Sequence, residues 1–278
     1  MGLKADLSPG RPAPKIVPVL TALGGFSQFG QILTFREIMA QCHGSELLFG
    51  LMLGAWLLWV AAGTALGAWW GSTWRDPNGY RPLKVLALST LASGPVLAGQ
   101  LLWLRLAPWG SAAVSGQWLS PAQSAWLSLL APAPLALLAG YQFSLALRAA
   151  PSQSVGPLFR AEAWGAMGGG LLTALVLVHL SGALSLALSI GALLTVPVLL
   201  LLRIQTQRPL AVSGALLAVV MLVAAALPLD RWSEERSWGH RLPGHSLLQV
   251  QNTRYGRLAL LQDKGGQQIS VFQNGEFL

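Results

Sequence analysis

Charged side chains are scarce in this sequence, so those that flank or interrupt apolar stretches are the first candidates for chemistry. Arg36, Glu37 and Glu46 flank the first pair of apolar segments, and Arg160 and Glu162 begin the fifth. Ionisable residues within apolar segments are costly and often mark functional sites. For the first group, contact with lipid headgroups and local ion pairing is the favoured interpretation. For Glu162, which we expect in the first turn of its helix, a functional role and a favourable helix-dipole interaction both stay open.

The sequence lacks the short motifs that carry hydrolytic, nucleotide or metal chemistry. It has no H-E-x-x-H, G-x-S-x-G or Walker pattern. Cys42 is the only cysteine, so neither an intrachain disulfide nor a zinc cluster is expected. The Gly-rich run 165–170 lies in an apolar segment and follows no predicted strand, so it is not a nucleotide-binding loop. We therefore expect no catalytic residue, no metal and no cofactor.

The composition indicates a protein whose main solvent is lipid. Residues are 53% hydrophobic and 10% charged, whereas soluble domains are about 25% charged. Twelve tryptophans against three tyrosines fit anchors at membrane interfaces. The net charge of +8 does not indicate nucleic acid, because no basic face with interleaved aromatic residues is present.

Apolar stretches of about 20 residues, long enough to cross roughly 30 Å of hydrocarbon, recur along the chain. The sequence predicts an α-helical integral membrane bundle of about seven transmembrane helices with a small C-terminal β-hairpin tail. The expected spans are 16–35, 46–71, 85–106, 124–147, 161–180, 183–202 and 210–229. Glycines four residues apart share a helix face and predict close helix packing. These helix-packing glycines are Gly50, Gly54, Gly63, Gly67, Gly165 and Gly169.

Three regions follow from this pattern: a basic arm at 1–15, a transmembrane helical domain at 16–229, and an incomplete β-rich tail at 230–278. In the tail, 246–252, 256–262 and 268–273 are predicted strands, and Asp263–Gly266 is a hairpin signal. Two or three short strands are marginal alone. We therefore expect the tail to need a partner or a further domain.

The distribution of basic residues predicts the orientation. Alternate loops carry most of the lysines and arginines, and such loops are normally cytoplasmic. The residues are Lys4, Arg11, Lys15, Arg75, Arg81, Lys84, Arg148, Arg160, Arg203 and Arg208. The opposite short loops hold only Arg36 and Arg105. A multi-pass protein of the inner (plasma) membrane is expected, with a cytoplasmic N-terminus and an extracytoplasmic tail.

Three stretches together resemble a known family, the membrane-embedded spermidine synthase-like proteins of bacteria, which are polyamine aminopropyltransferases. In the first stretch, 24–71, the match lies in a Gly-rich helix, an arginine at its end, a Gly-Ser pair and a glycine pair. In the second, 140–182, Ser144 stands where the family usually has proline, and Trp164 is also unusual. The matching residues are Arg36, Gly44, Ser45, Gly63, Gly67, Gly140, Phe143, Leu145, Phe159, Glu162, Gly165, Gly169 and Gly182.

The third stretch, from Ser246 to the end, is similar to the small β-domain that opens a spermidine synthase. Gln249 matches the glutamine of the family's Tyr-Gln pair, which helps to hold the aminopropyl donor, whereas Leu248 replaces the tyrosine. Asn274-Gly275 matches a turn of the family. The resemblance implies Gln249, Glu162 and Arg36 as candidate substrate-binding residues.

The family's Rossmann-like catalytic domain has no counterpart in this sequence, so we expect the chain to be inactive alone. The favoured hypothesis is a membrane module that anchors, and supplies substrate to, an aminopropyltransferase domain. Two alternatives stay open: a small polyamine or metabolite transporter, and a structural scaffold for a separate synthase subunit. The expected partners are the lipid bilayer and either a separate catalytic synthase subunit or further copies of this chain.

Overall fold

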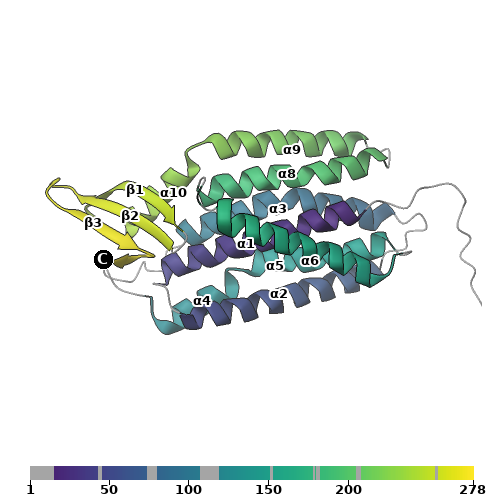
Figure 1. Ribbon diagram of the computed structural model, residues 1–278, viewed down its shortest axis with the longest axis horizontal. Helices are drawn as coiled ribbons and strands as arrows, with labels where there is room; N and C mark the ends of the chain where they lie inside the picture. The colour runs from purple at the N-terminus through teal and green to yellow at the C-terminus, as the bar shows by residue number, and fades with distance from the viewer. Residues whose placement is uncertain are drawn as a thin grey trace, which may run out of the picture.

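The computed structural model describes residues 16–42, 46–73, 80–106, 119–150, 153–177, 179, 182–204, 208–253 and 256–278. Long helices lie side by side along the longest axis, and a small sheet lies at one end of them (Figure 1). The predicted basic arm at 1–15 lies outside the described residues. The helices are α1 (Val17–Gln41), α2 (Glu46–Ser72), α3 (Tyr80–Leu106), α4 (Pro121–Leu130), α5 (Ala133–Ala149), α6 (Val155–Leu172), α8 (Ala183–Ile204), α9 (Arg208–Ala226) and α10 (Leu229–Arg241).

Four candidate membrane spans are present among the described helices, and the number rises to five if a bent pair counts as one. The four are Leu47–Ser72, Arg81–Leu106, Pro121–Ala149 and Ala183–Leu201. The bent pair joins Ala211–Ala226 to Leu229–Arg241 at an angle of 53°. The helices α1 and α6 lie along the same bundle but are not in this set, since glycines, glutamines and charged residues lower their hydropathy. The expected figure of seven spans is therefore not confirmed, since four or five are found among the described helices.

Glycine contacts hold the helices together in pairs. On α1, a Cβ at Gly24 would lie 2.1 Å from the carbonyl oxygen of Glu162 on α6. On α2, a Cβ at Gly63 would lie 2.1 Å from the carbonyl oxygen of Leu137 on α5. Since such distances exclude any side chain, the backbones meet directly, as is common for small residues in packed membrane helices. Gly67, Gly165 and Gly169, also predicted as packing residues, have similarly close neighbours.

A Cβ at Gly50 or at Gly54, by contrast, would have no neighbouring heavy atom within 4 Å. Gly54 and Gly63 are nine residues apart, which is half a turn beyond two full turns at 100° per residue. The two glycine pairs therefore lie on opposite sides of α2. The side with Gly63 and Gly67 packs on α5. The side with Gly50 and Gly54, which was also predicted to pack closely, makes no close contact with another helix within the described chain.

The break between α4 and α5 shows how the bundle satisfies backbone groups at a helix end. A helix start leaves its first N–H groups without intrahelical partners. Here the side-chain oxygen of Gln100, on α3, accepts a hydrogen bond from the Leu135 N–H at 3.1 Å. The Gln100 amide nitrogen donates to the Thr34 hydroxyl at 2.8 Å. A single buried amide therefore ties α1, α3 and α5 together.

The tail begins with a helix and ends in an antiparallel sheet. Its strands are β1 (His245–Thr253), β2 (Gly256–Asp263), β3 (Ile269–Gln273) and β4 (Glu276–Phe277), in the order β1-β2-β3-β4. The first three agree with the predicted strands within a few residues, and β4 follows the Asn274-Gly275 turn, where both residues have positive φ. One face of the sheet, with Ala259 and Leu261, packs on Trp238 of α10. A helix at Leu229–Arg241 was not expected.

Candidate functional site: a buried ionic network between helices and sheet

Glu37, near the end of α1, is the centre of a group of charged side chains at the end of the bundle. Its side chain has 0% exposure. The Arg257 guanidinium, from β2, donates to both of its carboxylate oxygens, at 3.0 Å to Oε1 and 2.6 Å to Oε2. Arg105 Nε lies 3.1 Å from the same Oε2, in ion-pair contact without hydrogen-bond geometry. A two-pronged arginine–carboxylate pair is among the stronger and more directional polar contacts.

Glu234, from α10, closes this arrangement into a ring of alternating charge. Its Oε1 lies 2.8 Å from Arg257 Nη1 and 3.3 Å from Arg105 Nη2. Each of the two arginines therefore lies between the carboxylates of Glu37 and Glu234. We call these four residues, together with Asp230, the ionic network. It joins α1, α3, α10 and β2, which are distant in the sequence.

Asp230 links the ionic network to a helix terminus. Its Oδ1 accepts from Arg105 Nη1 at 2.9 Å. The two carboxylate oxygens also accept from the N–H groups of Leu184 and Ser185, at 3.0 and 2.8 Å, in the first turn of α8. Asp230 thus supplies from another helix the acceptor that an N-cap residue usually provides. Gly182 leaves space for it, since a Cβ there would lie 2.1 Å from the Asp230 carboxyl carbon.

Two further arginines hold the end of α1 from outside the ring. Arg36 donates to the carbonyl oxygens of Thr253 and Gly256, at 2.8 and 3.3 Å, on either side of the β1–β2 turn. Arg241, at the end of α10, donates to the Ala40 carbonyl oxygen at 3.2 Å and to the side chain of Gln41. The Arg241 guanidinium also lies 5.3 Å from the centre of the Trp238 ring. Sheet and α10 are thus both bonded to the last turns of α1.

The site holds one more arginine than carboxylates. Three carboxylates, from Glu37, Asp230 and Glu234, lie among the guanidinium groups of Arg36, Arg105, Arg241 and Arg257. Burial alone would raise the pKa of Glu37, but Arg105 and Arg257 outweigh it and lower that pKa to about 2. Burial alone would lower the pKa of Arg257. The carboxylates of Glu234 and Glu37 outweigh this effect, so that the pKa is raised above its ordinary value. Glu37 and Arg257 are therefore both charged throughout the neutral range.

This arrangement is suited to holding parts together. Every carboxylate in it lies in ion-pair contact with at least one arginine, so its charge serves to join elements of the fold. Within the described residues there is no group of three or more His, Cys, Asp or Glu that could hold a metal ion. The chemistry that the geometry supports is directional attachment of the sheet to the helical bundle.

The three residues suggested as substrate-binding do not form one site. Arg36 bonds to the β1–β2 turn, and Gln249 is exposed on β1, opposite Leu260. Glu162 lies beside Gly24, which precedes Arg36 by twelve residues, or about 18 Å along a helix. Since α6 begins at Val155, Glu162 is not in the first turn, and the expected helix-dipole interaction is wrong. No hydrogen bond or ion pair to Glu162 occurs among the described residues.

Sequence reasoning missed most of the ionic network. Arg105 was interpreted as a loop residue, yet its side chain is 2% exposed. Asp230, Glu234 and Arg257 were not singled out. One usable signal was present: Asp230 and Glu234 are four residues apart and so share a face of any helix. The spacing of nearby residues could not show that this face would meet Arg105 and Glu37, because both are distant in the sequence.

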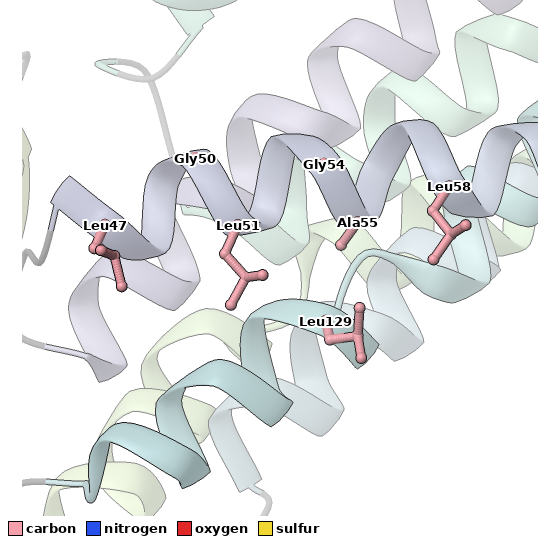
Figure 2. Close-up of a pocket in the computed structure, with 7 residues that line it drawn as sticks. All are labelled: Leu47, Gly50, Leu51, Gly54, Ala55, Leu58 and Leu129. Atoms are coloured by element: carbon pink, nitrogen blue, oxygen red, sulfur yellow. The ribbon is translucent and has the colours of Figure 1, made fainter.

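A hollow lies between α2 and α4, where the side chains of Leu51 and Leu58 point toward Leu129 (Figure 2). Gly50 and Gly54 form part of its wall. Its lining residues are all apolar or glycine, so it offers no group that could act on a substrate.

Comparison of the chain with models of protein families, with curated proteins and with solved structures finds no match. The function therefore has to be argued from the chain itself.

Proposed function

We propose that this protein is an integral membrane protein with about seven transmembrane helices, which holds a small β-module in a fixed orientation at one end. The exposed residues of the bundle support this placement. Leu57, Val212 and Leu216 are 68%, 68% and 64% exposed, and they lie on the outer helices α2 and α9. Large apolar side chains at such exposure are stable in hydrocarbon and costly in water.

Membrane insertion can be tested directly. Membranes from cells expressing the protein would be washed with alkaline carbonate and then extracted with detergent. We expect the chain to stay in the carbonate pellet and to need detergent for solubility. Recovery in the carbonate supernatant would contradict the proposal. A topology reporter after Leu278 should place the tail on the extracytoplasmic side, as the basic loops predict.

We further propose that the chain is the membrane module of a spermidine synthase-like protein. The support is the resemblance, and several residues that carry it have a structural reason for their type. Gly63, Gly140 and Gly165 lie at direct backbone contacts, and Gly182 makes room for Asp230. In this proposal the module anchors an aminopropyltransferase domain, and the β-module is the point of attachment. The ionic network carries the proposal, because it makes the sheet a rigid extension of the membrane helices.

One observation favours the alternative of a scaffold for a separate synthase subunit. The face of the sheet turned away from Trp238 carries Leu258, Leu260 and Val271, all partly exposed. A strand whose apolar residues run on both faces is typical of a sheet covered on both sides. A catalytic partner would cover this outer face.

Two measurements separate these possibilities. The tagged full chain would be purified in mild detergent from its native host, and the eluate would be assayed for aminopropyl transfer to putrescine. Activity that depends on a co-purified subunit supports the scaffold, and activity of the chain alone would contradict the prediction that it is silent. Polyamine flux through reconstituted vesicles without any bound synthase would favour a transporter instead.

A further inference from the structure

A second polar site lies on the outer face of α10, opposite the ionic network. Residues of this helix alternate in pairs, with Ser233, Glu234, Ser237 and Trp238 buried, and with Trp232, Arg236, Gly239 and His240 exposed. The inner pairs face the network and the sheet. Both faces of the helix therefore carry polar side chains, and those of the inner face are engaged by the ionic network.

The exposed face of α10 borders a hollow with the end of α3. Its lining residues are Leu106, Trp232, Arg236 and His240. The last three are spaced by four residues and so form one row along the helix. Leu106 is the final residue of the candidate span Arg81–Leu106. If that helix spans the bilayer, the hollow lies at the boundary between hydrocarbon and headgroups.

The guanidinium of Arg236, which lines this hollow, has no carboxylate partner in the described part of the chain. Asp230 and Glu234 are engaged by the ionic network, and Glu235 pairs with Arg231 at 2.8 Å on the exposed surface. That leaves Arg236 without an acidic neighbour on its own helix. Arg236 and His240 make no hydrogen bond or ion pair within the residues that the structure describes. Their donors are thus available to a ligand.

The chemistry of the hollow matches one class of ligand. Guanidinium groups bind phosphate oxygens in a two-pronged geometry, and an imidazole N–H adds a further donor. Tryptophan rings favour the headgroup region of a bilayer, where one side of the ring is apolar and its N–H meets polar groups. Leu106 continues the apolar surface toward the bundle. Basic pockets beside transmembrane helices are a recognised site for anionic lipid headgroups.

We propose that Arg236 and His240 bind the phosphate group of an anionic phospholipid, with Trp232 against its glycerol region and Leu106 against the start of an acyl chain. This inference rests on the membrane placement in the proposed function, but not on the resemblance to spermidine synthases. The bound lipid would hold α10 at the membrane surface, and α10 in turn holds the sheet through the ion pair of Glu234 with Arg257 on β2.

The test is a lipid titration of the full chain in detergent micelles, followed by native mass spectrometry. The probes are phosphatidylglycerol, phosphatidylcholine and inorganic phosphate. We expect phosphatidylglycerol to bind more tightly than phosphatidylcholine, and millimolar inorganic phosphate not to displace it. Displacement by inorganic phosphate at the same concentration would instead assign the hollow to a soluble phosphate and overturn the lipid source.

Variants assign the binding to this hollow. Arg236→Gln should weaken phosphatidylglycerol binding by about fivefold, the usual effect of one cation near an anionic membrane surface. The double variant with His240→Gln should weaken it further. The matched control is Arg231→Gln, which removes the same charge from an exposed position of α10 outside the hollow, and it should change binding by less than twofold. Equal losses in Arg231→Gln and Arg236→Gln would show a general charge effect and contradict the proposal.

A second measurement does not depend on those variants folding. Bromine atoms near the headgroup quench tryptophan fluorescence at short range, so brominated phosphatidylglycerol reports on Trp232. The quenching difference between the wild-type chain and Trp232→Phe should exceed that seen with brominated phosphatidylcholine. Equal differences for both lipids would refute the site. A chain that stays soluble without detergent would refute the membrane placement instead, so the two failures are distinguishable.

Discussion

The replacement of Glu37 by glutamine is the sharpest test of the ionic network. Glutamine has nearly the same shape but no charge, so Arg105 and Arg257 lose the carboxylate that they share. The side chain of Glu37 is 0% exposed, and water cannot replace the lost contacts without opening the site. The site would then hold two carboxylates and four arginines, so the net positive charge between helix and sheet would increase.

The expected cost follows from this loss. Removing one partner of a buried ion pair costs about 3–5 kcal/mol. We expect the lower end of that range, because glutamine keeps one carbonyl oxygen that can accept from Arg257 Nη1 or Nη2. A loss of about 3 kcal/mol corresponds to roughly a hundredfold shift in the equilibrium between docked and undocked sheet.

Hydrogen exchange in detergent measures this equilibrium locally. Amides of β2 and α10 should exchange about a hundredfold faster in Glu37→Gln, whereas amides of α5, which packs on α2 through glycines, should be unchanged. The matched control is Glu235→Gln, which breaks the exposed pair with Arg231 and should cost at most about 1 kcal/mol. If exchange in Glu37→Gln stays within threefold of that control, the network does not hold the sheet.

Three further outcomes are expected. The pKa of Glu37 in the folded protein, about 2, lies below its ordinary value of 4.5. The stability that Glu37 contributes is therefore full above about pH 4.5 and is lost as the pH falls toward 2. Pepsin cleavage of the tail should rise over this window in the wild-type chain and should vary less with pH in Glu37→Gln. Gly63→Leu should lower the thermal midpoint in detergent, since its Cβ would lie 2.1 Å from the α5 backbone, whereas Gly54→Leu should not; equal effects would contradict the packing. Gln100→Leu leaves the Leu135 N–H without its partner and should cost about 1–3 kcal/mol in chemical denaturation, and a neutral result would contradict that role.

The helices and strands could largely be predicted because their signals are local. Apolar runs and turn residues placed β1 to β3, α2, α8 and α9 within three residues. By contrast, α1 ends six residues later and α3 begins five residues earlier than expected, and α4 and α5 divide one expected span. Local signals failed where one stretch of sequence is compatible with either a charged loop or a helix. The segment Asp230–His240 was interpreted as a charged exit from the membrane, yet its charges repeat with helical spacing and form α10. Its tertiary contacts with the sheet decide the outcome.

The candidate site could not be predicted because its pairs are distant in sequence. Arg105 and Asp230 are 125 positions apart, and Glu37 and Arg257 are 220 apart. Charge type and spacing say nothing of which surfaces meet. Glycine spacing has the same weakness: Gly50/Gly54 and Gly63/Gly67 have identical four-residue spacing, but only the second pair lies in close contact with another helix of the described chain. Composition indicates that a helix can pack closely, whereas the topology of the fold determines which element it packs on.

The choice of charged residues at this junction has a consequence for orientation. The apolar contact between α10 and the sheet is small, with Trp238, Ala259 and Leu261 as its buried members. Apolar contact is non-directional, so a core of this size would hold the sheet near the bundle without fixing its angle. The two-pronged bonds of Arg257 to Glu37, and the bonds of Arg36 to both sides of the β1–β2 turn, fix that angle at two separate points. The charged contacts therefore contribute direction to this junction, which the small apolar core alone does not supply.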